Sequence, residues 1–536
     1  MIRLPRAAVA AAALLLSGPA LARAADGDVS ALVTAARAGD AATVRSLLAR
    51  PGAGVNATEH DGTTALHWAV QHGQVDVVKA LIRARADVNR KNRYGVAPLW
   101  LAATNGDNAS VEALLRAGAD AQTTRGDSGE TVLMIAAMAG SPGVLQRLLA
   151  YGADPNAKDN IRGQTALMWA AAEGHPDAAR VLVEVGADIE AKSSTGITPL
   201  MFAIRAGHIP ATRALLDLGA NLHALAPDGT TNLGLAIINA HWELAAALLD
   251  RGADANTNDP RGRPLHLVAF MRRAENRGLS AWLPRKPTGQ IDSIDLAKKL
   301  LAKGAKVNDR LDYKNPNYNP THMAVGYFQS ISWQGATPFY IASKNCDVEF
   351  MRFMLEQGAD PKIGTTQNVT PLLAAAGVGY AIGESPGTPE EALEAVKLLA
   401  SLGNDVNAIA RLSADGDNRR RGGGGGGGLG GWDGATALHG AVIRGAKGLV
   451  EWLIAQNIPL DVKGPGGQTA LEHARGSGLG VTFHVQPELA EIIEKAMRAK
   501  GLEIPEHKYT GNGDISTAGN PAAAGGQGGG GAQNRQ

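Results

Sequence analysis

The sequence predicts an all-α solenoid of about twelve helix-turn-helix repeats with projecting turns and long loop insertions. Three observations predict this fold. A large apolar residue returns about every 33 residues, a small residue follows it three positions later, and in most copies a glycine follows it seven positions later. The apolar markers are Leu32, Leu66, Leu99, Leu133, Leu167, Leu200, Leu233, Leu265, Phe339, Leu372, Leu438 and Leu471. Because three positions keep phase, one structural unit is repeated along roughly residues 28–475.

Each unit is expected to contain a turn and two short helices. In the unit of Leu66, Asp61 and Gly62 form the turn, and Thr64 is placed to cap the first helix. That helix should end at Gly73, where a left-handed conformation stops it. A second helix then presents one apolar face, made by Val77, Val78, Leu81 and Ile82. Sister units have proline at the first helical position, where a missing N–H costs nothing, at Pro98, Pro199, Pro264, Pro338 and Pro371.

The run Thr64-Ala65-Leu66-His67-Trp68-Ala69 resembles the T-P-L-H-x-A signature of the ankyrin repeat family. The resemblance implies a curved stack of helix pairs whose turns project along one edge. Arrays of this family generally bind other proteins rather than catalyse reactions. The resemblance also implies a structural role for three histidines that follow marker leucines and would hydrogen-bond neighbouring turns, His67, His266 and His439.

Residues 1–24 have the composition of a signal peptide. Arg3 and Arg6 form a basic start, residues 7–16 are apolar, and residues 20–22 or 22–24 offer a small-x-small cleavage site. The alternative is a membrane anchor, but an apolar run of about ten residues is short for a span of about 20. No later run is apolar for long enough. We therefore expect an exported, bacterial-type ankyrin repeat protein, periplasmic or secreted, without a membrane span in the mature chain.

Insertions divide the repeat array. Residues 28–265 are expected to form regular repeats, and residues 266–475 form repeats with long insertions. The Leu265 unit carries about 20 extra residues between its helices and about 21 in the following turn, and the Leu372 unit carries about 12 and about 21. Regular units flank these excursions, so the stack should continue beneath them. Residues 476–507 are expected to be a C-terminal capping helix region, with a helix from about Pro487 to Lys500, and residues 508–536 a disordered tail.

The first pair of excursions is rich in aromatic residues. Nine of the 23 aromatics lie between Phe270 and Tyr340, where an even spread would place about three. Aromatic and arginine side chains are favoured anchors of protein interfaces. The predicted protein-binding residues are Trp282, Arg285, Tyr313, Tyr318, Tyr327, Phe328 and Trp333. The alternative is that these aromatics fold the loops back onto the solenoid as a small extra core, and both interpretations can hold together.

Composition excludes several classes of protein. Lysine plus arginine number 52 against 51 aspartate plus glutamate, so net charge gives no reason to expect nucleic acid or membrane binding. The single cysteine, Cys346, excludes an intramolecular disulfide and a cysteine-built zinc site, and we expect a partly exposed thiol without a special role. Residues 411–432 contain the triplet Arg419-Arg420-Arg421 followed by an unbroken glycine run at 422–428, but lack the Gly-Lys-Ser or Gly-Lys-Thr of a phosphate-binding loop. This segment is predicted to be a flexible linker; the alternative is that its basic triplet touches an acidic partner.

Two segments resemble catalytic motifs, but neither lies in the structural context that its motif requires. Gly126-Asp127-Ser128-Gly129 imitates a serine protease segment but lies in a repeat turn, and residues 383–387 fit G-x-S-x-G but lie in a loop insertion. His72, His175 and His208 lie near helix ends and are predicted to make local polar contacts. The aspartates of the Gly-Ala-Asp turns are predicted to form those turns, namely Asp120, Asp154, Asp188 and Asp254. We assign no catalytic residue, no metal ligand and no cofactor, and we expect no enzyme.

The sequence therefore favours an exported scaffold that binds another protein through its concave face and its extended loops. One alternative is an accessory subunit of an envelope enzyme, and another is a secreted factor that acts on foreign proteins. A third is an enzyme whose site lies within the excursions of residues 270–337. The expected partner is a protein and not a nucleic acid, and the chain is expected to be monomeric.

Overall fold

The computed structural model describes residues 30–272, 289–312, 333–379, 387–411, 432–476 and 485–506. The described chain divides into two compact units, the first ending at Thr366 and the second beginning at Gln367. Both are helical. The described residues contain one small sheet, the antiparallel pair of β1 (Thr124–Arg125) and β2 (Glu130–Thr131). The predicted all-α fold is therefore confirmed for this part of the chain.

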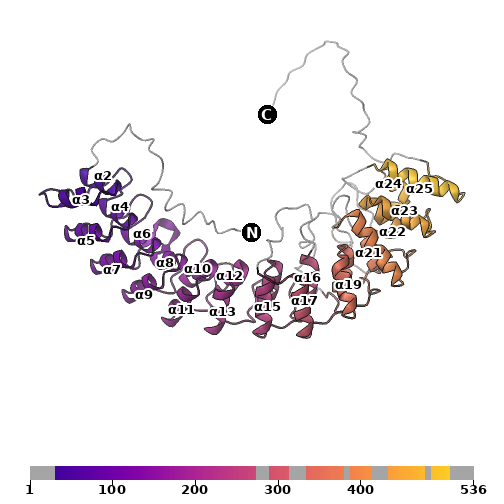
Figure 1. The fold of residues 1–536 in the computed structure, drawn as a ribbon, viewed down its shortest axis with the longest axis horizontal. Coiled ribbons are helices and arrows are strands. Elements are labelled where there is room, and N and C mark those ends of the chain that lie inside the picture. Colours follow the sequence, from indigo (N-terminus) through magenta and orange to yellow (C-terminus); the bar gives the residue numbers. More distant parts are fainter. Residues whose placement is uncertain are drawn as a thin grey trace, which may run out of the picture. The chain divides into compact units, whose positions relative to one another are not determined.

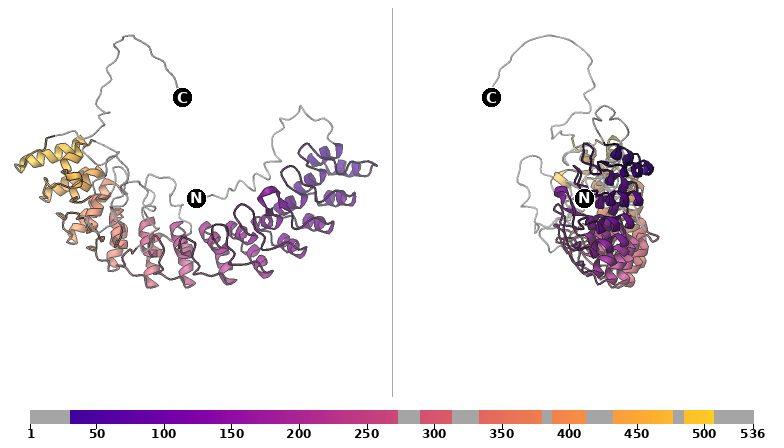
Figure 2. Two further views of the ribbon diagram at one scale, coloured as in Figure 1. Left: turned by 180° about the vertical axis from the view of Figure 1, so that it is seen from behind. Right: turned by 90° about the vertical axis from the view of Figure 1, so that its left-hand side faces the viewer.

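The first unit is built from pairs of short helices. The first helices of the pairs are α2 (Ala31–Arg37), α4 (Ala65–Gln71), α6 (Pro98–Thr104), α8 (Val132–Met138), α10 (Ala166–Glu173), α12 (Pro199–Ala206), α14 (Asn232–Ile238), α16 (Pro264–Met271) and α18 (Pro338–Lys344). The second helices are α3 (Ala41–Leu48), α5 (Val75–Arg83), α7 (Asn108–Arg116), α9 (Pro142–Ala150), α11 (Pro176–Glu184), α13 (Ile209–Asp217), α15 (Trp242–Asp250), α17 (Ser293–Ala302) and α19 (Val348–Glu356). Each first helix packs against the next, from α2 to α18, so that the first and second helices form two rows (Figure 1). Figure 2 shows the same stacking order from behind.

The second unit repeats this arrangement. Its helices are α20 (Pro371–Ala376), α21 (Pro389–Ser401), α22 (Ala437–Arg444), α23 (Lys447–Ala455), α24 (Ala470–Ala474) and α25 (Pro487–Ala499). Helix α22 packs between α20 and α24, and α23 packs between α21 and α25. The last helix thus lies where the sequence predicts it.

Local chemistry explains where the helices begin and end. Thr64 caps α4 by accepting a hydrogen bond from the backbone N–H of His67. Gly62 and Gly73 have φ of 82° and 65°, which serve the turn before α4 and the stop after it. On α5, Val77, Val78 and Leu81 are buried as expected, whereas Ile82 is only half-buried.

Three residues replace the helix-ending glycine, and two of them keep the positive φ of that glycine. Ala240 and Cys346 have φ of 56° and 53°, whereas Arg272 keeps helical angles at the end of α16. The expectation of a partly exposed thiol is wrong, because Cys346 is fully buried. Its neighbours Asn345 and Asp347 are also fully buried, so the chain here lies inside the stack and not on its surface.

A ladder of side-chain amides joins consecutive repeats. Asn89 donates to the carbonyl of Gly118 (2.9 Å) and accepts from the N–H of Asp120 (2.8 Å), two groups of the next repeat. The Asp120 carboxylate in turn accepts from the N–H of Gln122 at 2.8 Å. The same bond is made by the aspartates of the other Gly-Ala-Asp turns, Asp154, Asp188 and Asp254. These carboxylates are therefore turn formers, as predicted.

The stack continues beneath the insertions. Asn256 donates to the carbonyl of Gly304 at 2.9 Å, and Asn308 donates to that of Gly358 at 3.1 Å, although about 50 residues separate the partners of each pair. Helix α16 also packs against α18. The inserted residues are therefore added to an intact array and do not break it.

Candidate functional site

Only one of the predicted binding residues lies within the described chain. Trp282, Arg285, Tyr313, Tyr318, Tyr327 and Phe328 fall outside it, and their role stays a prediction. Trp333 is described and is 5% exposed. Its ring centroid lies 5.8 Å from that of Phe270, and the ammonium of Lys344 lies 5.6 Å from its centroid. Trp333 thus lies in a buried aromatic contact, as expected if the aromatics form an added core.

Arg272 anchors the point where the first excursion leaves α16. Its guanidinium makes two bonds to the Asp347 carboxylate, at 2.6 and 3.2 Å, although 75 residues separate the two. It also donates to Ser293 and to Glu349, each at 2.6 Å. The side chains of Arg272 and Asp347 are 11% and 1% exposed, so this bidentate pair is nearly desolvated.

The charge on Arg272 is fixed. Burial alone would lower its pKa, but the hydrogen bonds and charges of Asp347 and Glu349 outweigh that effect and raise it. The guanidinium carbon also lies 5.0 Å from the ring centroid of Phe350. This cluster can hold the chain in place.

The residues that flank the two turn excursions make the same pair of backbone hydrogen bonds. In the first unit, Leu311 N–H donates to Ala336 (2.9 Å) and Gly335 N–H donates to Leu311 (2.8 Å). In the second unit, Ala410 N–H donates to Ala435 and Gly434 N–H donates to Ala410, both at 2.8 Å. A sequence signal marks both closures, because Trp333-Gln334-Gly335-Ala336-Thr337 and Trp432-Asp433-Gly434-Ala435-Thr436 share four of five residues. Trp432, like Trp333, is buried at this point.

The histidines that follow marker leucines have the structural role that the resemblance implies. Thr64 N–H donates to Nδ1 of His67 at 3.2 Å, and Nε2–H of His67 donates to the Val96 carbonyl at 3.0 Å. His439 makes the equivalent bonds, and His266 donates to the carbonyl of Asp309. Burial lowers the pKa of His67, His266 and His439 to about 4 in each case. All three are neutral bridges between turns at pH 7.

The remaining histidines singled out in the sequence also make polar contacts. His72, His175 and His208 each donate through Nε2 to a carbonyl at the end of the preceding first helix, at 3.0 to 3.1 Å. They make polar contacts, as predicted, but each contact caps a helix of the neighbouring repeat and is not local in sequence.

The protease-like segment lies in a turn. Ser128 Oγ donates to the Arg125 carbonyl at 2.8 Å, within the turn that joins β1 to β2. The serine is thus bound to its own turn. Residues 383–386 of the second motif lie outside the described chain.

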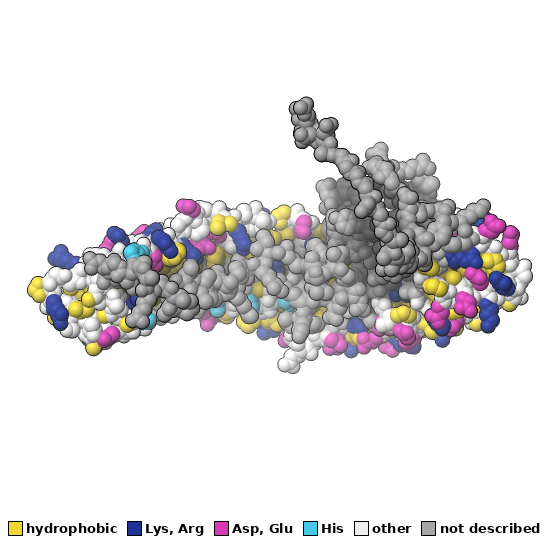
Figure 3. Space-filling view, turned by 90° about the horizontal axis from the view of Figure 1, so that it is seen from above, with side chains coloured by type: hydrophobic (Ala, Val, Ile, Leu, Met, Phe, Trp, Pro, Cys, Tyr) yellow, Lys and Arg dark blue, Asp and Glu magenta, His cyan; other side chains and the backbone are white. Residues whose placement is uncertain are grey.

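The described residues offer neither a metal site nor a membrane span. These residues contain no cluster of three or more histidine, cysteine, aspartate or glutamate side chains placed to hold a metal ion. None of the described helices is long and apolar enough to cross a membrane. On the face shown in Figure 3, acidic, basic and hydrophobic side chains are interspersed wherever described residues are visible.

Comparison with known proteins identifies the repeat. A family of three-copy ankyrin repeats matches residues 9–92, 99–193 and 190–259, and a single ankyrin repeat matches residues 334–366. Among solved structures, the human ASB11 ankyrin repeat domain is 28% identical, with the match covering 42% of this chain and 99% of that domain at a TM-score of 0.37. No curated protein matches the chain.

Proposed function

The chain belongs to the ankyrin repeat family, and from that premise we propose that it is an exported scaffold that binds another protein through its concave face and its extended loops. Ankyrin repeats generally serve as scaffolds for protein interactions. Each repeat is clamped by its neighbours, so the surface is formed before the partner arrives and little ordering cost is added on binding.

The fixed base of the excursions is the observation that carries this proposal. Arg272 is bound to Asp347, and Trp333, directly after residues 313–332, packs on Phe270. Below them the amide ladder runs from Asn256 to Gly304 without interruption. Binding residues often lie on loops that a rigid scaffold positions. Long segments attached to this stack at buried anchors are therefore suited to contact a partner.

Export is a separate part of the proposal and rests on residues 1–24, which lie outside the described chain. The family match begins at residue 9, inside this segment. Mass spectrometry of the protein recovered from its own cell envelope tests export. A chain that begins after Ala22 or Ala24 is expected, whereas an uncleaved chain in the cytoplasm would contradict it.

Affinity capture from the cell envelope tests the scaffold proposal. The bait is the mature protein, beside a variant in which a short Gly-Ser turn replaces residues 313–332 and leaves the closing bonds of Leu311 and Gly335 in place. A matched control replaces residues 412–431 in the same way. A partner that the 313–332 variant loses and the control retains is the expected result. One dominant enzyme as that partner would indicate an accessory subunit.

The remaining outcomes separate the other interpretations. Equal recovery of a partner by all three baits would move the site to the regular repeats. Recovery of no partner would contradict a scaffold that acts within its own envelope and favour a factor that acts on foreign proteins.

A further inference from the structure

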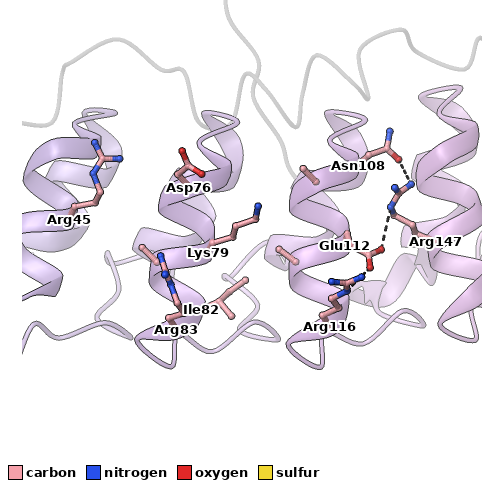
Figure 4. Close-up of a pocket in the computed structure, with 12 residues that line it drawn as sticks. Arg45, Asp76, Lys79, Ile82, Arg83, Asn108, Glu112, Arg116 and Arg147 are labelled. Atoms are coloured by element: carbon pink, nitrogen blue, oxygen red, sulfur yellow. Dashed lines mark hydrogen bonds and ion pairs between the residues drawn. The ribbon is translucent and has the colours of Figure 1, made fainter.

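A groove lies on the row of second helices, away from the excursions. It has a volume of about 910 Å³ and is formed by α3, α5, α7 and α9 of four consecutive repeats (Figure 4). Three alanines, Ala80, Ala109 and Ala113, line it between the charged side chains, and the half-buried Ile82 adds an apolar surface. We call it the basic groove, after the charged residues that define it: Arg45, Lys79, Arg83, Glu112, Arg116 and Arg147.

The two ends of the basic groove differ in charge balance. At the α7 and α9 end, Glu112 forms ion pairs with Arg116 (2.6 Å) and Arg147 (3.3 Å), and Arg147 also donates to Asn108. At the other end, the side chains of Arg45, Lys79 and Arg83 make neither an ion pair nor a hydrogen bond with any described residue. Figure 4 shows Lys79 extending from α5 toward α7 without a partner. Three cations thus face a single unpaired carboxylate, Asp76.

The spacing of these cations limits what can bind. Arg45 and Lys79 occupy equivalent positions of consecutive repeats, thirteen residues after Leu32 and Leu66. Packed helices lie about 8–10 Å apart. An extended peptide advances about 10 Å in three residues, so acidic residues three positions apart would meet Arg45 and Lys79 in turn, and the equivalent position of the next repeat is Glu112.

We propose that the basic groove is a second docking surface, which binds an extended acidic segment of a partner protein with carboxylates at about every third position. The segment crosses the second helices and pairs with Arg45, Lys79 and Arg83. Its intervening side chains contact the alanines that line the groove. The proposal goes beyond the scaffold function above, because it concerns the opposite row of helices and needs neither excursion.

A designed peptide tests this surface. The probe is a labelled peptide of about 12 residues with glutamate at every third position and proline and threonine between, which favours a polyproline II chain of about 37 Å. Its binding to the full chain is measured by fluorescence anisotropy. The basic-groove variant Arg45→Gln/Lys79→Gln/Arg83→Gln should bind about tenfold more weakly, and wild-type binding should weaken as salt is added.

The matched control removes the same charge elsewhere in the first unit, with Arg180→Gln on α11, Arg213→Gln on α13 and Lys303→Gln at the C-cap of α17. It should bind the peptide like the wild type. An equal loss in both variants, equal binding of a peptide with glutamine in place of glutamate, or no binding by the wild type would each overturn the proposal. Stronger binding of phosphatidylserine vesicles or single-stranded DNA, lost in the basic-groove variant, would assign the surface to a lipid or a nucleic acid instead and would also overturn it.

Discussion

Arg272 departs from the repeat pattern, and its contacts explain why. Most repeats place glycine at this position to stop the first helix, but α16 stays helical here and directs a guanidinium into the stack. Asp347 lies one residue after Cys346, the next departure from the same pattern. The irregular position of Arg272 therefore serves a buried ion pair.

Asp347→Asn should destabilise the protein by about 3 kcal/mol, because it removes half of a buried ion pair and leaves the Arg272 charge poorly compensated. Asparagine keeps the N-cap of α19, so the loss reports on charge. The matched variant Glu349→Gln affects a side chain that is 71% exposed and should cost well under about 1 kcal/mol. Urea unfolding measures both, and equal losses would contradict the anchoring role.

The neutral histidines make stability depend on pH. Because burial lowers the pKa of His67, His266 and His439 to about 4 from a usual 6.5, the unfolded chain takes up protons first as pH falls. Their contribution is complete above about pH 6.5 and is lost as pH falls toward 4. The unfolding midpoint should therefore drop between pH 7 and pH 5, and the drop should be smaller in His67→Gln, which has one titrating group fewer. Identical drops in both proteins would show that His67 is not held neutral.

At the scale of elements, helices α20 and α22 approach more closely than side chains allow. Gly377 has φ of 117°, and a Cβ atom there would lie 2.5 Å from the carbonyl oxygen of Gly440. This contact lies just before the second inter-helix excursion, in the second unit. Glycine is thus needed for both its conformation and its size.

Gly377→Ala should therefore cost about 1–3 kcal/mol more than Gly467→Ala. Gly467 also has positive φ, at 75°, but no atom lies within 4 Å of its Cβ position, so its substitution adds only backbone strain of about 1 kcal/mol. Denaturant unfolding of both variants, which lie in the same unit, compares the free-energy cost of the steric clash with that of backbone strain alone. A cost for Gly467→Ala that matched Gly377→Ala would mean that the close approach adds nothing.

The sequence could predict elements but not which side chains they bury. Marker leucines, threonine caps and prolines locate the helices because these signals act within a few residues. Composition alone predicts Trp333 as a binding residue, and composition does not record that Phe270 and Lys344 contact its ring. The Arg272–Asp347 pair joins residues 75 apart, and no local pattern links them. The basic groove had a detectable signal, cations thirteen residues after Leu32 and Leu66, but its alanine lining and unpaired charges required coordinates.

At the scale of the whole molecule, the stability of the repeat array does not depend on the residues inserted into it. The amide ladder and the α16 contact with α18 hold the first unit together beneath the inserted residues. Replacement of residues 313–332 by a short turn should therefore leave the free energy of unfolding within about 0.5 kcal/mol of the wild-type value. Replacement of residues 309–334 should destabilise the protein, because it also removes Leu311, Trp333 and the Asp309 carbonyl that His266 binds. Equal stability of the two variants would contradict the role given to the closing bonds.

The affinity of the captured partner for the 313–332 variant tests the central claim most directly. Isothermal titration against the wild type, the variant and the 412–431 control would be run on proteins with matched unfolding midpoints. If residues 313–332 are the recognition element, the variant should lose at least about 3 kcal/mol of binding free energy, roughly a hundredfold in Kd, and the control should lose little. Undiminished affinity in a fully folded variant would contradict the claim and place recognition on the regular repeats.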